Sequence, residues 1–205
     1  MAAPAQAERS WTVDDPDLPD GHEVVDGRLV PRRQERVWEV DDPDVPERCE
    51  IVDGRLLPKL MPGVRHSQVA ARLARQLARQ LPPGWEELGE FTLRLGRGSR
   101  DPDAGVVRHP PRSSPDLQNG YDPADVALAV EVVSPGSRTT DRLLKPAQYA
   151  DAGIGTYWRV ETDPDVVVHV HRLVDGTYRE VAQVRGVEQV DDPFPLTLDV
   201  PALTA

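Results

Sequence analysis

The chain of 205 residues contains little cysteine, little lysine and few aromatic side chains. Its one cysteine, Cys49, excludes an internal disulfide, as is typical of a reducing, intracellular setting. No apolar run approaches the roughly 20 residues of a membrane-spanning helix. The first ten residues lack the basic start and apolar block of a secretory signal. We therefore expect a cytoplasmic protein with no membrane partner.

Positive charge is also scarce. The net charge of −11 argues against a protein that coats nucleic acid in general, because such proteins are basic. It still allows an enzyme with a local basic cleft and acidic metal ligands. Of the 24 basic residues, 22 are arginine and two are lysine, Lys59 and Lys145. A chain with this composition has little reason to keep a lysine where any cation would serve.

A sequence repeat lies near the N-terminus. "WTVDDPDLPDGHEVVDGRLVP" begins at Trp11 and "WEVDDPDVPERCEIVDGRLLP" begins at Trp38, a constant offset of 27 residues. Each copy predicts a β-hairpin with an Asp-Gly turn. We interpret residues 1–36 as an N-terminal extension that carries the extra hairpin, and residues 37–205 as the main domain. The extra hairpin is expected to lengthen a sheet or to pack against a partner chain, as in a homodimer.

Helical and strand patterns alternate along the main domain. The first helix is amphipathic, with Ser67 as its expected N-cap and arginines on its outer face. The expected elements are a helix at 66–81, strands at 85–96, 102–107 and 126–133, a turn and helix over 134–153, a strand at 156–161 and a hairpin around 175–176. This order predicts a mixed α/β sheet.

A carboxylate interrupts the most apolar of these strands. Glu131 lies between Val130 and Val132 in "VALAVEVV", which has no polar face. Burying an unpaired carboxylate costs several kcal/mol, so Glu131 must be protonated, paired or coordinated. One interpretation is a salt bridge to an arginine, and the other is a metal ligand.

Asp103 supplies a second carboxylate on a neighbouring strand. It opens the strand in "PDAGVV", just before the Glu131 strand. Mg²⁺ is often held by one or two carboxylates together with several waters. We therefore predict that Asp103 and Glu131 bind Mg²⁺, with Mn²⁺ as a substitute. Asp101, two residues earlier, competes for the role of Asp103.

Lys145 completes the predicted set. Its compact ammonium, whose pKa can be tuned, suits an attacking water or a scissile phosphate better than a guanidinium does. The alternative is a helical i,i+4 pair with Asp141, worth only a few tenths of a kcal/mol. Arginine would serve that pair equally well, which favours the functional interpretation.

These residues resemble the Uma family, a restriction-endonuclease-like group within the PD-(D/E)XK nuclease superfamily. The resemblance covers about residues 37–205 and rests on Pro102-Asp103, "EVVSP" from Glu131, Asp141 to Lys145, Tyr149, Gly153, "YWRVE", "CEIVDGRLLP" and "HS" at 66–67. It implies a restriction-endonuclease-like αβββαβ core, with a mixed central sheet and extra β-hairpins. It also implies that Asp103 and Glu131 are metal ligands.

The resemblance adds Glu50 and His66 near the same cleft. His66 would position water or phosphate and Glu50 would add a carboxylate; alternatively, His66 is a polar residue at a helix start. In the wider superfamily the lysine lies two residues after the acid, where this chain has Val133. The Uma pattern carries it on the following helix, and Lys145 matches. Pro146 either removes a helical hydrogen bond there or starts a new helical segment.

Together these features predict a Mg²⁺-dependent endonuclease that hydrolyses DNA phosphodiester bonds. The metal would activate a water, and Lys145 would orient that water or stabilise transition-state charge. Arg138, Arg142 and the arginines of helix 66–81 would hold the DNA backbone. The alternative is a catalytically inactive nuclease-like scaffold that binds protein or nucleic acid. A third hypothesis is hydrolysis of RNA or of a nucleotide second messenger.

Two histidines near the C-terminal end have a spacing that zinc ligands also show. His169 and His171 share one face of a predicted strand, but no third ligand is apparent nearby. We interpret both as surface residues.

Overall fold

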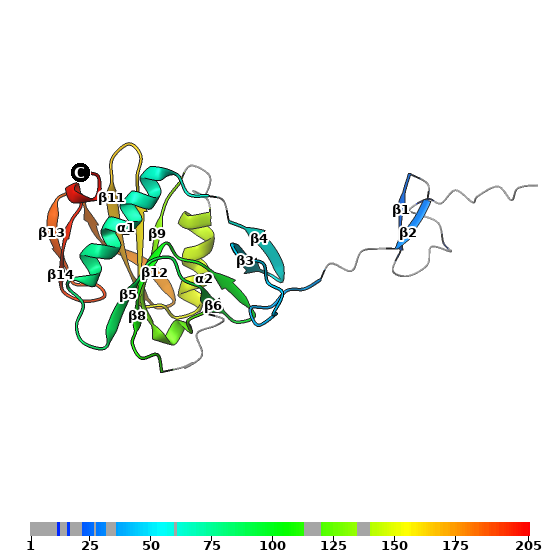
Figure 1. The fold of residues 1–205 in the computed structure, drawn as a ribbon, viewed down its shortest axis with the longest axis horizontal. Coiled ribbons are helices and arrows are strands. Elements are labelled where there is room, and N and C mark those ends of the chain that lie inside the picture. The colour runs from blue at the N-terminus through cyan, green and yellow to red at the C-terminus, as the bar shows by residue number, and fades with distance from the viewer. Residues whose placement is uncertain are drawn as a thin grey trace, which may run out of the picture. The chain divides into compact units, whose positions relative to one another are not determined.

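The computed structural model describes residues 12, 16, 22–26, 28–31, 36–59, 61–112, 120–134 and 140–205. The backbone forms two compact units, Met1–Val37 and Trp38–Ala205 (Figure 1). Part of the first repeat copy, and Arg138, lie outside the described residues. In the first unit, β1 (His22–Val25) and β2 (Arg28–Pro31) form an antiparallel hairpin.

A six-stranded sheet is the centre of the second unit. Its spatial order is β12-β11-β10-β9-β8-β5. The strands are β5 (Trp85–Leu88), β8 (Ala104–Arg108), β9 (Val126–Val132), β10 (Thr156–Glu161), β11 (Val167–Val174) and β12 (Thr177–Val184). Only the β9–β10 pair is parallel among these described strands. With α1 (Val64–Ala78) before β5 and α2 (Lys145–Asp151) between β9 and β10, the predicted αβββαβ core and mixed sheet are confirmed.

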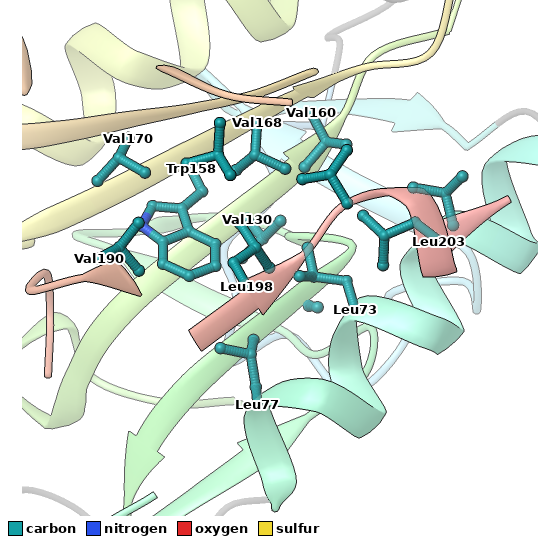
Figure 2. Packing of buried hydrophobic residues seen from close by; sticks show 14 of the residues in the cluster. Leu73, Leu77, Val130, Trp158, Val160, Val168, Val170, Val190, Leu198 and Leu203 are labelled. Carbon is teal, nitrogen blue, oxygen red and sulfur yellow. The ribbon is translucent and has the colours of Figure 1, made fainter. Parts of the chain in front are cut away.

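The two helices cover opposite faces of this sheet. Because side chains alternate along a strand, Val130 faces the main hydrophobic core while its neighbours Ala129 and Glu131 face the other way. Leu73 and Leu77 of α1 pack with Val130 and Trp158 in that core (Figure 2). Tyr149 of α2 packs with Ala129 on the other face. Glu131 therefore points toward α2.

Smaller sheets flank the central one. A four-stranded sheet has the order β4-β3-β7-β6, and β13 (Val187–Val190) pairs with β14 (Leu196–Asp199). The four strands are β3 (Cys49–Val52), β4 (Arg55–Pro58), β6 (Leu93–Leu95) and β7 (Gly98–Arg100). The β3–β4 turn has positive φ at Asp53 and Gly54, as a two-residue Asp-Gly hairpin requires. The two repeat copies share one register, Cys49 opposite Pro58 and His22 opposite Pro31.

The first helix begins earlier than the sequence predicts. It starts at Val64 with Gly63 as its N-cap, and no side chain caps it. Ser67 was predicted as the N-cap, and this is wrong because its backbone N–H already donates to Gly63 O at 3.1 Å. The Ser67 hydroxyl donates to the same carbonyl.

The predicted strand at 85–96 is two strands in two sheets. β5 ends at Leu88 and β6 begins at Leu93. Thr92 O, just before β6, accepts a hydrogen bond from Tyr121 N, and Tyr121 O accepts one from Arg94 N of β6. β6 belongs to the four-stranded sheet and not to the central one.

His171 was expected at the surface and is instead buried. Only 9% of its surface is exposed, and its ring lies 5.5 Å from that of Tyr157.

No helix in the described ranges is long and apolar enough to cross a membrane.

Candidate active site

The predicted site residues come from five segments that meet at the end of β9. Asp103 immediately precedes β8, and its N–H donates to Val130 O at 2.9 Å, so it lies beside the end of the Glu131 strand. Lys145 is the first residue of α2, and Glu50 lies in β3. His66 lies in the first turn of α1.

Glu131 is fully enclosed and both its oxygens are hydrogen-bonded. Its exposed fraction is 1%. Lys145 Nζ lies 2.7 Å from Oε2, and the Tyr149 hydroxyl donates to Oε1 at 2.5 Å. The charged partner of this buried acid is therefore Lys145. The sequence had also allowed a salt bridge to an arginine.

Lys145 reaches this acid because of how its helix begins. A π-helical turn, η2 (Thr140–Leu144), precedes α2, and Pro146 occupies the first turn of α2. Proline is tolerated there because the first helical N–H groups have no intrahelical acceptor. Of the two expected effects of Pro146, the start of a new helical segment is the one observed. Within the segment 134–153, predicted as a turn and a helix, the α-helix covers Lys145–Asp151, and Gly153 follows it with φ of +80°.

Two more carboxylates surround the Lys145 ammonium. Asp141 Oδ1 lies 3.4 Å from Nζ, and Glu50 Oε1 lies 3.7 Å away. The i,i+4 pair with Asp141 exists, but as one contact of a larger cluster. The lysine side chain is 10% exposed.

Asp103 connects His66 to the end of β9, where Glu131 lies. Its Oδ2 accepts a hydrogen bond from Val132 N at 2.7 Å and lies 3.1 Å from His66 Nε2. Burial lowers the pKa of His66, but the hydrogen bond and charge of Asp103 outweigh it and raise that pKa. His66 Nδ1 is buried without a hydrogen-bond partner among the described residues. The competitor Asp101 is instead paired with Lys59, at 3.1 Å.

A buried arginine that sequence reasoning missed fixes Glu50. Arg100 Nη1 donates to Glu50 Oε2 at 2.8 Å, and its Nε donates to Gln148 Oε1 of α2 at 2.8 Å. Burial raises the pKa of Glu50, but the Lys145 charge and the hydrogen bonds from Asp101 N and Arg100 lower it below its ordinary value. Nothing in the sequence distinguishes Arg100 from the other arginines. Tyr149 is one of the residues that resemble the Uma family. Its spacing of four residues from Lys145 places both side chains on one helical face.

Burial and neighbouring charges shift the pKa values of both the buried acid and the lysine. Burial raises the pKa of Glu131 to about 8, opposed by Lys145 and reinforced by Asp103 and Asp141. Burial lowers the pKa of Lys145, but Glu131, Glu50 and Asp141 outweigh it and hold that pKa above its ordinary value. The carboxylates of the cluster therefore keep the ammonium of Lys145 charged.

The donor set fits a hard divalent ion. Carboxylate oxygens are the ligands that Mg²⁺ prefers, and each carboxylate has about four lone-pair sites, so Glu131 keeps acceptor capacity beside Lys145 and Tyr149. Within the described ranges, no group of three or more His, Cys, Asp or Glu side chains is placed to hold an ion unaided. An ion here would take Asp103, Glu131 and water.

Two arginines that were predicted to hold the DNA backbone, Arg72 and Arg142, contact other parts of the chain in the structure. Arg72 Nη1 donates to Leu203 O at 3.0 Å, so this arginine holds the C-terminal segment. Arg142 of η2 lies close to the cluster in sequence and pairs with Glu161 at 2.9 Å.

Comparisons with known proteins agree with the fold. Residues 38–202 match the model of the Uma2 family, described as "Putative restriction endonuclease". A crystal structure of a "putative nuclease belonging to DUF820" from Anabaena variabilis ATCC 29413 has the same fold, with a TM-score of 0.59 and 20% identity. The match covers 81% of this chain and 97% of that one. A comparison with curated proteins gave no match. The chain belongs to the Uma2 family of restriction-endonuclease-like proteins.

Proposed function

We propose that the chain is a nuclease that hydrolyses DNA phosphodiester bonds with Mg²⁺, or Mn²⁺ in its place, held by Asp103 and Glu131. The observation that carries this proposal is the contact of the Lys145 ammonium with Glu131 inside a cluster rich in carboxylates. The carboxylate oxygens of Asp103 and Glu131 are the kind of ligand that Mg²⁺ prefers. A divalent ion bound there would lower the pKa of a water and stabilise charge on a phosphate.

Lys145 is the residue we assign to the reacting phosphate. Its ammonium stays charged because the surrounding carboxylates hold its pKa up. A charged donor already fixed by Glu131 needs no reorganisation when charge develops on a phosphate oxygen. It would orient the attacking water or stabilise that charge.

The remaining residues hold the reacting groups in place. The Tyr149 hydroxyl fixes one oxygen of Glu131, and His66 fixes Asp103. Arg100 holds Glu50 3.7 Å from Lys145 Nζ, through the carboxylate oxygen on the side away from the lysine. We assign His66 Nδ1, which has no partner in the described part of the chain, to a water or phosphate oxygen.

The test is the nicking of supercoiled DNA in Mg²⁺ or Mn²⁺. Wild type should cleave, whereas Lys145→Ala and Glu131→Gln should lose most activity while keeping their circular-dichroism spectra. Equal cleavage by all three proteins would remove this mechanism.

An inactive scaffold that binds protein or nucleic acid is the second candidate. It is favoured by one observation: Lys145 and Tyr149 already occupy both oxygens of Glu131, and no three-ligand group lies in the described ranges. Titration calorimetry with Mg²⁺ separates the two candidates. Binding by wild type that disappears in Asp103→Asn supports the nuclease, and absence of binding supports the scaffold.

The N-terminal region has a separate proposed role. We infer that residues 1–36 form an extension whose hairpin contacts a second copy of the chain. The support is that β1–β2 repeats the register of β3–β4, which pairs through Ile51 with Ser99 of β7. Sedimentation of the full chain and of a chain lacking residues 1–36 tests this. A dimer is expected only for the full chain, and the same oligomeric state for both would contradict it.

A further inference from the structure

A groove of about 420 Å³ lies beside the candidate active site. Its lining includes Arg142, Arg159, Glu161, His169 and Arg185. These come from η2, from the neighbouring strands β10 and β11, and from the residue after β12. The segment η2 contributes Arg142 to the groove and leads directly into Lys145, so one segment positions both residues.

The strand register connects the groove to Glu131. Arg159 of β10 is the register partner of Glu131 on the parallel strand β9, and His169 of β11 is the partner of Arg159. Register partners lie on one face of a sheet, with strands about 4.8 Å apart. Arg159 is thus one strand away from the buried acid, and His169 is two strands away. The groove continues the row that begins at Glu131.

The charges of the groove are arranged so that its arginines keep free donors. Glu161 accepts two hydrogen bonds from Arg142, at 3.0 and 2.9 Å, and one from Arg159 Nε at 3.1 Å. Its negative charge is therefore matched by two guanidiniums. In the contacts made within the described ranges, Arg159 uses only Nε, and Arg185 uses only Nη2, toward Gln183 at 3.2 Å. Their other N–H groups are open to a ligand.

This donor pattern suits phosphate. A guanidinium held by a carboxylate presents its remaining N–H groups in a fixed fork, which matches the oxygens of a phosphate. No Phe, Tyr or Trp is among the described residues that line the groove, so it offers no platform for stacking a base through these side chains. The chain carries a net charge of −11, so its overall charge repels DNA. A local set of arginines then determines where a strand approaches.

We propose that this groove binds a backbone phosphate of the DNA strand, adjacent to the phosphate that is hydrolysed at Lys145. The proposal rests on the proposed nuclease function. A strand whose scissile phosphate lies at Lys145 and that runs along this row would pass over Arg159 and on toward Arg185. Asp163 and Asp165, in the loop after β10, also line the groove, so the arginines and not the overall charge of the groove would select a phosphate.

The experiment measures binding without cleavage. A fluorescent single-stranded DNA oligonucleotide is titrated with the full chain in EDTA, by anisotropy, over a series of salt concentrations. Arg185→Gln is the first variant, because this exposed side chain makes no ion pair within the described structure. Arg142→Gln/Arg185→Gln is the second. Arg179→Gln, on β12 and outside the groove lining, is the matched control.

Arg185→Gln should weaken binding by about threefold to tenfold, as expected for the net contribution of one hydrogen bond at an exposed site. The salt slope should fall by roughly 0.7 for each phosphate that no longer has an arginine partner. The double variant should bind more weakly still, and Arg179→Gln should bind as wild type does. Unchanged affinity in both groove variants, or no DNA binding by wild type, would overturn the proposal.

The failure of the groove and the failure of the nuclease are distinguishable. If the groove variants bind DNA weakly but wild type never cleaves, phosphate binding by the groove is supported and the nuclease function is contradicted. If wild type cleaves with a KM that the groove variants do not change, the nuclease function is supported and phosphate binding by the groove is contradicted.

Discussion

The ammonium of Lys145 lies 2.7 Å from Oε2 of Glu131, joining the first residue of α2 to the buried end of β9. A buried ion pair of this kind contributes little net stability, because desolvation of both charges offsets their attraction. Its presence in a chain with only two lysines is better explained by a reaction than by folding. Variants of the residues around this pair separate the two roles.

Tyr149→Phe removes one hydroxyl and leaves Oε1 of Glu131 without its donor. The free energy of unfolding should fall by about 1–3 kcal/mol, the cost of an unsatisfied buried acceptor. Cleavage should fall about tenfold, since supporting partners of a metal ligand typically contribute that much. Urea unfolding and plasmid nicking measure the two effects.

The matched control is Tyr178→Phe. This hydroxyl donates to Ile154 O at 2.7 Å and has no contact with Glu131 in the described structure. The variant should be destabilised to a comparable extent, with unchanged cleavage. Equal cleavage by both variants would show that Tyr149 has only a structural role.

The stability of the metal-free protein should fall as pH rises. Burial raises the pKa of Glu131 to about 8 from an ordinary 4.5. Between these values the folded state keeps a proton that the unfolded state has released, so the free energy of unfolding decreases with pH. The slope for one group is at most about 1.4 kcal/mol per pH unit.

Urea unfolding in EDTA across this pH range measures that slope. Glu131→Gln has no such proton, so it should lack this component and be less pH-dependent than wild type. Identical pH profiles for the two proteins would mean that Glu131 is ionised in the folded state throughout.

The two acids near β8 should differ in metal binding. Asp103 contacts His66 and Val132 N, whereas Asp101 pairs with Lys59. Asp103→Asn should abolish the calorimetric Mg²⁺ signal, because one of two charged ligands is removed. Asp101→Asn should keep it. Loss of binding in Asp101→Asn alone would reassign the ligand.

Much of the fold follows from local sequence signals. The Asp-Gly hairpins, the apolar strand at Val126–Val132 and the stop at Gly153 were each predicted from a few adjacent residues. The incorrect predictions concern segments whose structure depends on contacts between residues far apart in the sequence. The break between β5 and β6 depends on hydrogen bonds to Tyr121, which is far along the chain.

The candidate site shows the same division. Glu131 and Lys145 stand out in the sequence, one by its apolar neighbours and the other by its rarity. Glu50 and His66 came from the resemblance alone, because each reaches the site through tertiary packing. Arg100 was missed, since its role depends on the meeting of β7, β3 and α2.

The two lysines offer the most direct test of the central claim, that Lys145 acts on the scissile phosphate. Lys59 is also partly buried and paired, with Glu90 at 2.7 Å and Asp101 at 3.1 Å, but lies outside the cluster around Glu131. The measurement is the rate of Mg²⁺-dependent DNA cleavage by wild type, Lys145→Ala and Lys59→Ala, each verified as folded. We predict that Lys145→Ala lowers the rate by about 100-fold or more, the effect of removing a preorganised charged donor, and that Lys59→Ala stays near wild type. Equal rates for Lys145→Ala and Lys59→Ala would contradict it.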